Sequence, residues 1–512
     1  MKLMKFIFSR MAIFGIILII QVGWAIWFIL DMGNSQVVYS LLFVLSLFCT
    51  IWIVYRDNNP AYKLAWIVPI LVFPLFGGLL YLAMGDKKPS KRYRKAMEAL
   101  DQNQSIQLRQ DECVMKQIEK EDPQVASQMK YLSYGTGYPV YQNTESTYYT
   151  VGEEYYEALL CELSKAKHYI FMEYFIVENG KMWQGILDIL VEKAKEGIDV
   201  RFIYDDVGCL SKLPFDYWRY LEKLGIKCIS FNPFVPFVSV AMNNRDHRKI
   251  CVIDGHTGFT GGINLADEYI NEIQRFGHWK DTGIMLKGNA VWSLTVMFLR
   301  MWNINRPTEQ DFAGYHPSIY MNECIIDEKS VKGYVQPYAD SPLDGEITGE
   351  NVYLNIIYQA TKYVYIMTPY LIIDYEMNSA LCLAAKRGVD VRIITPGIPD
   401  KKIVFGLTRS YYPSLMEAGV KIYEYTPGFL HAKCFVSDDN IATVGTINMD
   451  YRSLYLHFEC GVLLNQTDSV LSLKNDFIKT MGTSHEVSKE MNEKGRASVL
   501  FRAVLRLFAP LL

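Results

Sequence analysis

Two short segments of the sequence carry histidine and lysine in the same frame, His-x-Lys-x4-Asp. The first copy comprises His247, Lys249 and Asp254, and the second comprises His431, Lys433 and Asp438. At a phosphodiester, one imidazole can attack phosphorus while a second imidazole protonates the leaving oxygen. The two lysines would neutralise the nonbridging phosphate oxygens in the transition state. The duplicated frame therefore predicts one composite catalytic site for phosphodiester chemistry, which needs neither a metal ion nor a cofactor.

Each copy is followed at the same distance by a glycine-led turn that ends in asparagine. The two turns are Gly261-Gly262-Ile263-Asn264 and Gly445-Thr446-Ile447-Asn448. A glycine before a strand is usually only a turn, so these glycines gain meaning through their register with the two frames. We expect Asn264 and Asn448 to bind the substrate phosphate by hydrogen bonds.

A nucleophilic imidazole needs an acceptor at its second ring nitrogen, because that contact fixes the tautomer and the orientation of the ring. Asp254 and Asp438 are candidates since they belong to the frames, although an aspartate at such a place can also cap a turn. Asp281 and Glu459 are rival candidates, because each follows the asparagine of its own copy in a predicted strand region. The spacing does not choose between these two pairs.

The other histidines have no counterpart in the duplication, and we expect them to be structural. They are His168, His256, His278, His316, His457 and His485.

The elements around the two frames are duplicated as well. Residues 166–174 correspond to residues 360–368, and both are runs of β-branched and aromatic side chains that suit a buried strand. A predicted helix follows each run and ends at a glycine, Gly197 or Gly388, before the next strand. This alternation predicts an α/β fold with mixed or mainly parallel sheets flanked by helices. We expect two pseudo-symmetric repeats, at residues 151–320 and 321–482.

The amino-terminal region, residues 1–90, has the pattern of a membrane anchor. Residues 11–30 and 37–55 carry no charge, and each segment is long enough to cross the ~30 Å hydrocarbon core of a bilayer as a helix. A short loop joins them, which predicts a transmembrane helical hairpin. Residues 64–84 are also uncharged, but prolines interrupt them, so we expect a re-entrant or interfacial segment. Basic residues on both sides of this region favour a cytoplasmic catalytic part.

The remaining segments and the composition give further predictions about structure and partners. Residues 91–150 are polar and predict a helical connector, and residues 483–512 form an amphipathic tail, either interfacial or packed as an ordinary terminal helix. The net charge of −3 and the pI near 6.3 argue against a nucleic-acid partner. The ten cysteines show no metal-binding spacing, and we expect reduced thiols. No feature of the sequence specifies an oligomeric state.

The two frames with their glycine turns are similar to the motifs of the phospholipase D superfamily. Nearly the whole chain resembles bacterial cardiolipin synthases, above all in residues 59–66, 244–249, 261–269, 368–370, 427–433, 445–453 and 506–512. The resemblance implies a multi-pass enzyme of the cell membrane that transfers a phosphatidyl group between two phosphatidylglycerol molecules and releases glycerol. It also implies a phosphatidyl-histidine intermediate, with His247 as the nucleophile and His431 as acid and then base. The reverse assignment of the two histidines is the alternative.

Two other functions are compatible with parts of this pattern. One is a membrane-bound phospholipase D-type hydrolase, or a transphosphatidylase with another acceptor. Hydrolysis and transfer differ in whether water reaches the covalent intermediate. The other is an inactive membrane scaffold, which two intact motifs oppose.

Overall fold

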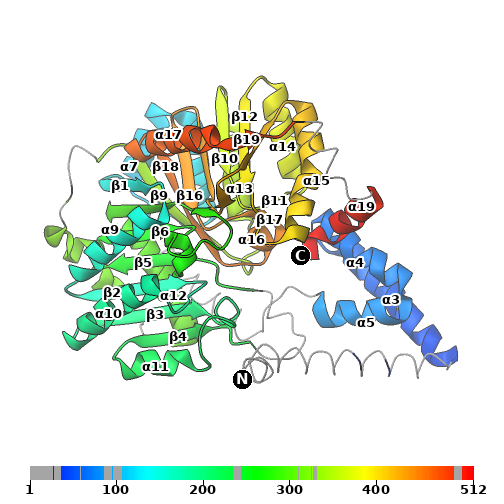
Figure 1. Cartoon of the computed structure of the whole chain (residues 1–512), viewed down its shortest axis with the longest axis horizontal. Helices are drawn as coiled ribbons and strands as arrows, with labels where there is room; N and C mark the ends of the chain where they lie inside the picture. The colour runs from blue at the N-terminus through cyan, green and yellow to red at the C-terminus, as the bar shows by residue number, and fades with distance from the viewer. Residues whose placement is uncertain are drawn as a thin grey trace.

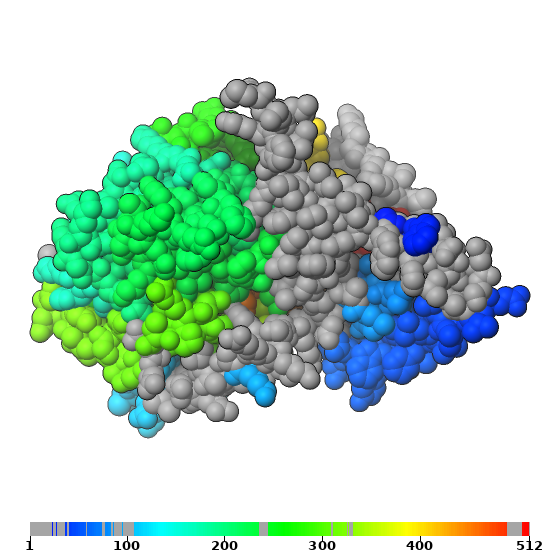
Figure 2. All heavy atoms as spheres, turned by 90° about the horizontal axis from the view of Figure 1, so that it is seen from below, coloured from blue at the N-terminus to red at the C-terminus, as the bar shows by residue number. Residues whose placement is uncertain are grey.

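The computed structural model of the chain describes residues 23, 27, 36–57, 59–85, 95, 107–234, 244–308, 311–324, 326, 331–488 and 499–511. Two α/β halves pack against each other, and a smaller group of helices lies at one side (Figure 1). Seen from below, the first half and the amino-terminal helices lie at opposite ends of the molecule (Figure 2). The predicted span 11–30 lies outside the described residues except for Gly23 and Trp27, and so do the basic residues at 87–94.

The first repeat is built on a seven-stranded sheet with the order β1-β8-β6-β5-β2-β3-β4. Its strands are β1 (Thr144–Tyr149), β2 (Tyr169–Tyr174), β3 (Asp199–Asp205), β4 (Lys227–Phe231), β5 (Lys249–Ile253), β6 (Thr257–Gly261) and β8 (Gly283–Gly288). β2, β3 and β4 are parallel to one another, whereas the other pairs are antiparallel. The sheet is mixed because a tight hairpin joins β5 to β6, and only antiparallel strands can be joined in this way.

The second repeat has an eight-stranded sheet with the order β9-β18-β16-β15-β10-β12-β13-β19. Its strands are β9 (Tyr334–Asp340), β10 (Tyr363–Met367), β12 (Asp390–Pro396), β13 (Lys421–Tyr425), β15 (Cys434–Ser437), β16 (Ile441–Gly445), β18 (Glu459–Asn465) and β19 (Ser484–Glu486). Apart from β19, each strand occupies the place of one strand of the first sheet. The prediction of two pseudo-symmetric repeats with mixed sheets is therefore confirmed.

Helices cover both sheets and fill the space between them. The first repeat carries α9 (Gly152–Ser164), α10 (Lys181–Lys195) and α11 (Tyr217–Lys223), and the second carries α13 (Thr348–Gln359), α14 (Tyr375–Lys386), α15 (Lys402–Ala418) and α17 (Asp468–Gly482). α12 (Val291–Asn305) belongs to a core shared by both repeats, and 13 of its residues are buried. A helix that is buried on nearly all sides packs against other elements on all of its faces, here elements of both repeats. α12 therefore holds the two repeats together.

The predicted connector contributes to this shared core. α7 (Glu112–Glu121), α8 (Pro123–Lys130) and the π-helical turn Tyr131–Gly135 place apolar side chains in it, and β1 is the edge strand of the first sheet.

The amino-terminal helices are α3 (Gln36–Tyr55), α4 (Pro60–Val72) and α5 (Pro74–Met84). The predicted interruption of residues 64–84 lies between α4 and α5, where Pro74 begins the second helix. Among the residues that the structure describes, none of the helices combines the length and the apolar character required to cross a membrane. The carboxyl-terminal α19 (Val499–Phe508) packs against α4 and α15.

Asn59 joins these helices to the second repeat. Its side-chain oxygen accepts a hydrogen bond from the N–H of Ala61 at the start of α4. Its amide group donates to the Asp374 carboxylate over 3.1 Å and to the Tyr455 hydroxyl over 3.0 Å. One side chain therefore caps α4 and contacts the repeat that carries His431.

A buried ion pair between the repeats generates a prediction about stability. Lys280 Nζ lies 2.7 Å from Asp476 Oδ2, and both side chains are almost completely buried. Asp476→Ala should lower the free energy of unfolding by about 3–5 kcal/mol, because it leaves a buried ammonium without its acid. Urea unfolding in detergent solution measures this change.

The matched control is Asp468→Ala, also in α17. Asp468 pairs with Lys332 over 3.2 Å at the surface, so its loss should cost less than about 1 kcal/mol. Equal losses for the two variants would contradict the assignment of the buried pair as a structural link.

Candidate active site

The two motif histidines lie where the repeats meet. His247 precedes β5 and His431 precedes β15, and each is fixed by backbone contacts to the other repeat. The N–H of His247 donates to the carbonyl of Phe458 over 2.9 Å, and the N–H of His431 donates to the carbonyl of Lys280 over 2.7 Å. Beside His431, β14 (Gly428–Leu430) pairs in parallel with β7 (His278–Lys280). The two frames therefore form one site, as the sequence predicts.

The acid that contacts each histidine comes from the opposite repeat. Glu459 Oε1 lies 2.9 Å from Nδ1 of His247, and Asp281 Oδ2 lies 2.6 Å from Nδ1 of His431. Both carboxylates are completely buried. Of the four acids that the sequence offered as partners of the motif histidines, Asp281 and Glu459 lie beside those histidines. Each of these contacts joins one repeat to the other.

The motif aspartates lie elsewhere, which corrects their prediction as catalytic residues. Asp254 accepts hydrogen bonds from the N–H groups of residues 167–169, at the start of β2. Asp438 accepts from those of residues 361–363, at the start of β10. Each aspartate follows the strand that its histidine precedes, and at about 3.3 Å per residue such a strand separates the two side chains. Both residues have positive φ, 49° and 54°, as in tight turns.

The two motif lysines point into the site with their histidines. Lys249 Nζ donates to the His247 carbonyl over 2.5 Å, and Lys433 Nζ lies 2.7 Å from His431 Nδ1. Burial lowers the pKa of Lys249 to about 8 and that of Lys433 to about 7, although nearby carboxylates oppose the shift. Two buried cationic groups beside two imidazoles are suited to an anionic substrate.

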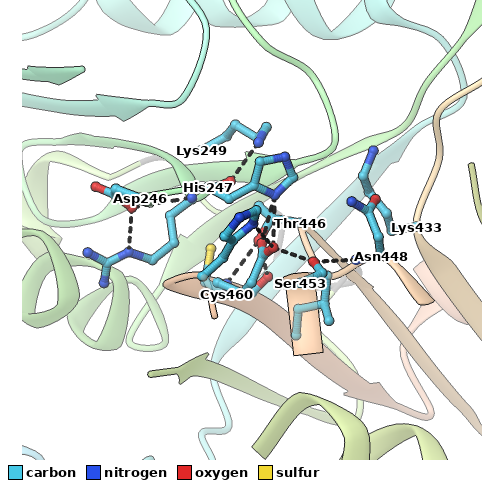
Figure 3. Close-up of polar contacts among 12 residues, drawn as sticks. Asp246, His247, Lys249, Lys433, Thr446, Asn448, Ser453 and Cys460 are labelled. Atoms are coloured by element: carbon cyan, nitrogen blue, oxygen red, sulfur yellow. Dashed lines mark hydrogen bonds and ion pairs between the residues drawn. The ribbon is translucent and has the colours of Figure 1, made fainter. Parts of the chain in front are cut away.

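The two asparagines differ in their contacts. Asn264 accepts from the N–H of Ile176 over 3.0 Å and donates to the Tyr269 hydroxyl over 2.7 Å, so its amide is engaged within the first repeat. Oδ1 of Asn448 is buried and has no hydrogen-bond partner among the described residues. Asn448 lies next to Lys433 (Figure 3). Of the two amides, only that of Asn448 has an oxygen without a partner among the described residues.

Two hydroxyl groups that the sequence did not single out hold Glu459. Thr446 Oγ1 donates to Oε2 over 2.5 Å, and Ser453 donates to Oε1 (Figure 3). The sequence does give a signal for Thr446, because it stands in the second glycine turn at the position that Gly262 occupies in the first turn. A side chain at Gly262 would begin 2.0 Å from Asp281 Oδ1, so the first repeat requires glycine there.

Burial controls the protonation of both histidines. It lowers the pKa of His247 to about 3, although Glu459 acts in the opposite direction, and that of His431 to about 4, where Lys433 adds to the effect. Both rings are therefore neutral near pH 7. With Nδ1–H donated to the carboxylate, Nε2 of each ring carries the free lone pair. A buried, oriented and neutral imidazole is equipped to act as a nucleophile or as a base.

Comparison with known proteins agrees with this geometry. Residues 159–295 and 353–481 match the family described as "Cardiolipin synthase, PLD-like domain". Cardiolipin synthase 2 of Bacillus anthracis is 37% identical over 477 residues, which cover 92% of this chain and 91% of the relative. The chain belongs to the cardiolipin synthase family of phospholipase D-like proteins. Residues 44–85 also match a family described as "Phospholipase_D-nuclease N-terminal".

Two further matches agree with membership of the cardiolipin synthase family. An uncharacterized protein of Streptococcus mutans is 48% identical over 450 residues, which cover 88% of this chain and 96% of the relative. The crystal structure of phosphatidylserine synthase from Haemophilus influenzae has a TM-score of 0.53 at 15% identity and covers 72% of this chain and 93% of that one. At this identity the solved structure supports the fold alone.

The histidine pKa values generate a prediction for stability against pH. A histidine whose pKa falls on folding binds more protons in the unfolded state than in the folded state. The free energy of unfolding therefore decreases as the pH falls from about 6.5 to the pKa of the folded state. Each site histidine should contribute up to about 1.4 kcal/mol per pH unit between pH 6 and pH 4. Urea unfolding at pH 7, 6 and 5 should therefore show a steeper loss in the wild type than in the His247→Gln/His431→Gln variant. Identical slopes would mean that the rings are not buried as described.

Proposed function

We propose that this protein is a cardiolipin synthase that moves a phosphatidyl group from one phosphatidylglycerol to another, giving cardiolipin and glycerol. The observation that carries the proposal is the pair of buried neutral histidines, each oriented by a carboxylate of the other repeat. Family membership and the printed name of the Bacillus anthracis relative support the substrate class.

In the first step, Nε2 of His247 attacks phosphorus of the donor lipid. The bond from phosphorus to the glycerol oxygen breaks, and His431 gives that oxygen a proton that it takes up when the anionic phosphate binds beside it, so glycerol leaves. In the second step, the terminal hydroxyl of another phosphatidylglycerol attacks phosphorus of the phosphatidyl-histidine, and neutral His431 takes the hydroxyl proton. The bond from phosphorus to Nε2 of His247 breaks, which releases cardiolipin and restores the neutral ring of His247.

Lys249, Lys433 and Asn448 are the groups that we assign to the phosphate. The ammonium groups would pair with the nonbridging oxygens, whose charge rearranges in the transition state. The Asn448 amide adds a donor, while its buried Oδ1 is free to accept from a hydroxyl group. Asn264, predicted to act in the same way, is assigned instead to holding its loop because both of its polar atoms are engaged.

The amino-terminal region would attach the enzyme to the cell membrane, with the catalytic repeats in the cytoplasm. We keep the predicted hairpin of residues 11–30 and 37–55 as part of this proposal. α3 supports it, because apolar side chains along most of its length are exposed, among them Leu41, Val44, Phe48 and Ile51. An exposed apolar surface of this kind requires a cover, and lipid acyl chains suit it.

Purified protein mixed with phosphatidylglycerol vesicles and excess chelator tests the proposed activity. We expect equimolar cardiolipin and glycerol from the wild type. We expect a loss of about a thousandfold or more in His247→Gln and in His431→Gln. Phosphatidic acid as the only lipid product would favour a hydrolase, and full activity of either variant would refute the assignment of the histidines.

The crossed acids generate a second prediction. Asp281→Asn and Glu459→Gln should each lower kcat by about a hundredfold or more, because an amide can hold the histidine in the wrong tautomer. Asp254→Asn and Asp438→Asn keep the shape of the turn and should mainly lower the thermal midpoint, with kcat per folded enzyme nearly retained. The kcat of all four variants, corrected for folded fraction by circular dichroism, checks the contrast. The reverse pattern would restore the motif aspartates as histidine partners.

A further inference from the structure

His457 is a histidine beside the site that the proposed reaction does not use. It lies just after α16 (Tyr451–Tyr455) and two residues before Glu459. Both of its ring nitrogens are buried, and neither has a hydrogen-bond partner among the described residues. Buried polar atoms almost always have partners, so two unsatisfied nitrogens on one ring need an explanation.

The ring of His457 faces two groups of the site. Its centroid lies 5.6 Å from that of His247, and its Nδ1 lies 3.7 Å from Glu459 Oε1. The latter distance is too long for a hydrogen bond. One ligand atom each from His247, His457 and Glu459 lies within 4.8 Å of the others. An ion placed between them would reach all three after small side-chain movements, since metal–ligand bonds of about 2.0–2.2 Å leave ligand atoms about 3–4 Å apart.

An acidic cavity leads to His457. The cavity has a volume of ≈ 430 Å³, and His457 lies on its wall. Among the described residues, its lining contains no lysine or arginine and six acidic residues: Asp57, Asp340, Glu346, Glu350, Asp374 and Glu376. Side-chain oxygen Oε1 of Glu350 is buried there without a hydrogen-bond partner. A cleft lined by one sign of charge raises the local concentration of ions of the opposite sign. Burial raises the pKa of Asp340 and raises that of Glu350 to about 8, so these two acids are neutral near pH 7. The lining still contains no opposing cation among the described residues, and the cavity favours the approach of cations to His457.

We propose that His247, His457 and Glu459 form a site for a divalent transition-metal ion of the Zn²⁺ type. Two imidazoles and one carboxylate are a ligand set that such ions prefer, whereas Mg²⁺ and Ca²⁺ prefer oxygen ligands alone. Three protein ligands leave a fourth position for water. His247 and Glu459 also act in the proposed transfer reaction, which itself needs no metal ion.

Occupation of this site would stop the transfer reaction. A metal ion bound at Nδ1 of His247 displaces the proton from that nitrogen and breaks the contact with Glu459. A neutral ring then carries its one proton on Nε2, where no lone pair is left to attack phosphorus. This consequence rests on the proposed role of His247, but metal binding does not.

Metal binding is measured directly on the full chain in detergent, stripped with chelator and then titrated with Co²⁺. The wild type should give visible absorption typical of low-symmetry cobalt with nitrogen and oxygen ligands, and excess Zn²⁺ should abolish it while Mg²⁺ should not. His457→Asn and His457→Gln should both lack this absorption and bind one ion fewer. His316→Asn, which changes a histidine remote from the site, is the control and should behave as the wild type.

Equal Co²⁺ stoichiometry and spectra in the wild type and both His457 variants would overturn the proposed site. Thiolate charge-transfer bands alone would mean that the free cysteines bind the ion, and would also overturn it. A His457 variant that does not fold is replaced by the other, with circular dichroism as the criterion.

Inhibition is measured separately, with each variant compared with its own turnover in chelator. The Zn²⁺ concentration that halves cardiolipin formation should rise about tenfold or more in His457→Asn, because loss of one outer hydrogen-bond partner alone weakens metal sites by about 10–100-fold. Co²⁺ binding without loss of turnover would overturn the inhibitory role and leave the site intact. Co²⁺ binding by a protein that forms no cardiolipin at all would refute the proposed function and not the metal site.

Discussion

The exchange of carboxylates between the repeats is the interaction on which the rest of the structure depends. Glu459 holds His247, and Asp281 holds His431, so neither repeat contains a complete histidine-acid pair. Buried carboxylates of this kind are costly unless they are hydrogen-bonded. Each carboxylate meets its histidine only when the repeats are docked, which links the integrity of the site to the interface. α12 and the Lys280–Asp476 pair stabilise that interface.

The two half-sites are similar but not equal. Glu459 accepts hydrogen bonds from the hydroxyls of Thr446 and Ser453, whereas Asp281 accepts from the N–H of Thr282 beside Gly262. Both motif lysines donate to the backbone carbonyl of their own histidine, and Lys433 also contacts a ring nitrogen of His431. Burial lowers the pKa of both histidines. A reaction that needs a nucleophile and a separate proton carrier can use such a difference.

Much of the fold was predictable because the duplication is visible as repeated sequence patterns. Repeated strands and helix-ending glycines indicated two α/β units, and the paired His-x-Lys frames indicated one composite site. The histidine partners were less predictable. Asp281, between β7 and β8, and Glu459, the first residue of β18, each reach a histidine of the opposite repeat, and no local spacing encodes that crossing. The motif aspartates were candidates for the same role because an aspartate that accepts hydrogen bonds from the first N–H groups of a strand cannot be told from a catalytic acid by residue type. Positive φ at Asp254 and Asp438 distinguishes them only in three dimensions.

One residue, Asn59, connects the amino-terminal helices to the candidate site. Asn59 binds Asp374 and Tyr455, and Tyr455 ends the helix that precedes His457 and Glu459. The amino-terminal helices and the candidate site are therefore joined through a few hydrogen-bonded side chains.

The most direct test of the central claim is to trap the covalent intermediate and map it. Enzyme mixed with phosphatidylglycerol labelled in its phosphate is denatured at alkaline pH, where phosphohistidine persists, and the labelled peptide is sequenced. The account predicts label on the peptide that contains His247. Label on the peptide that contains His431, or cardiolipin formation with no labelled peptide at any time, would contradict it.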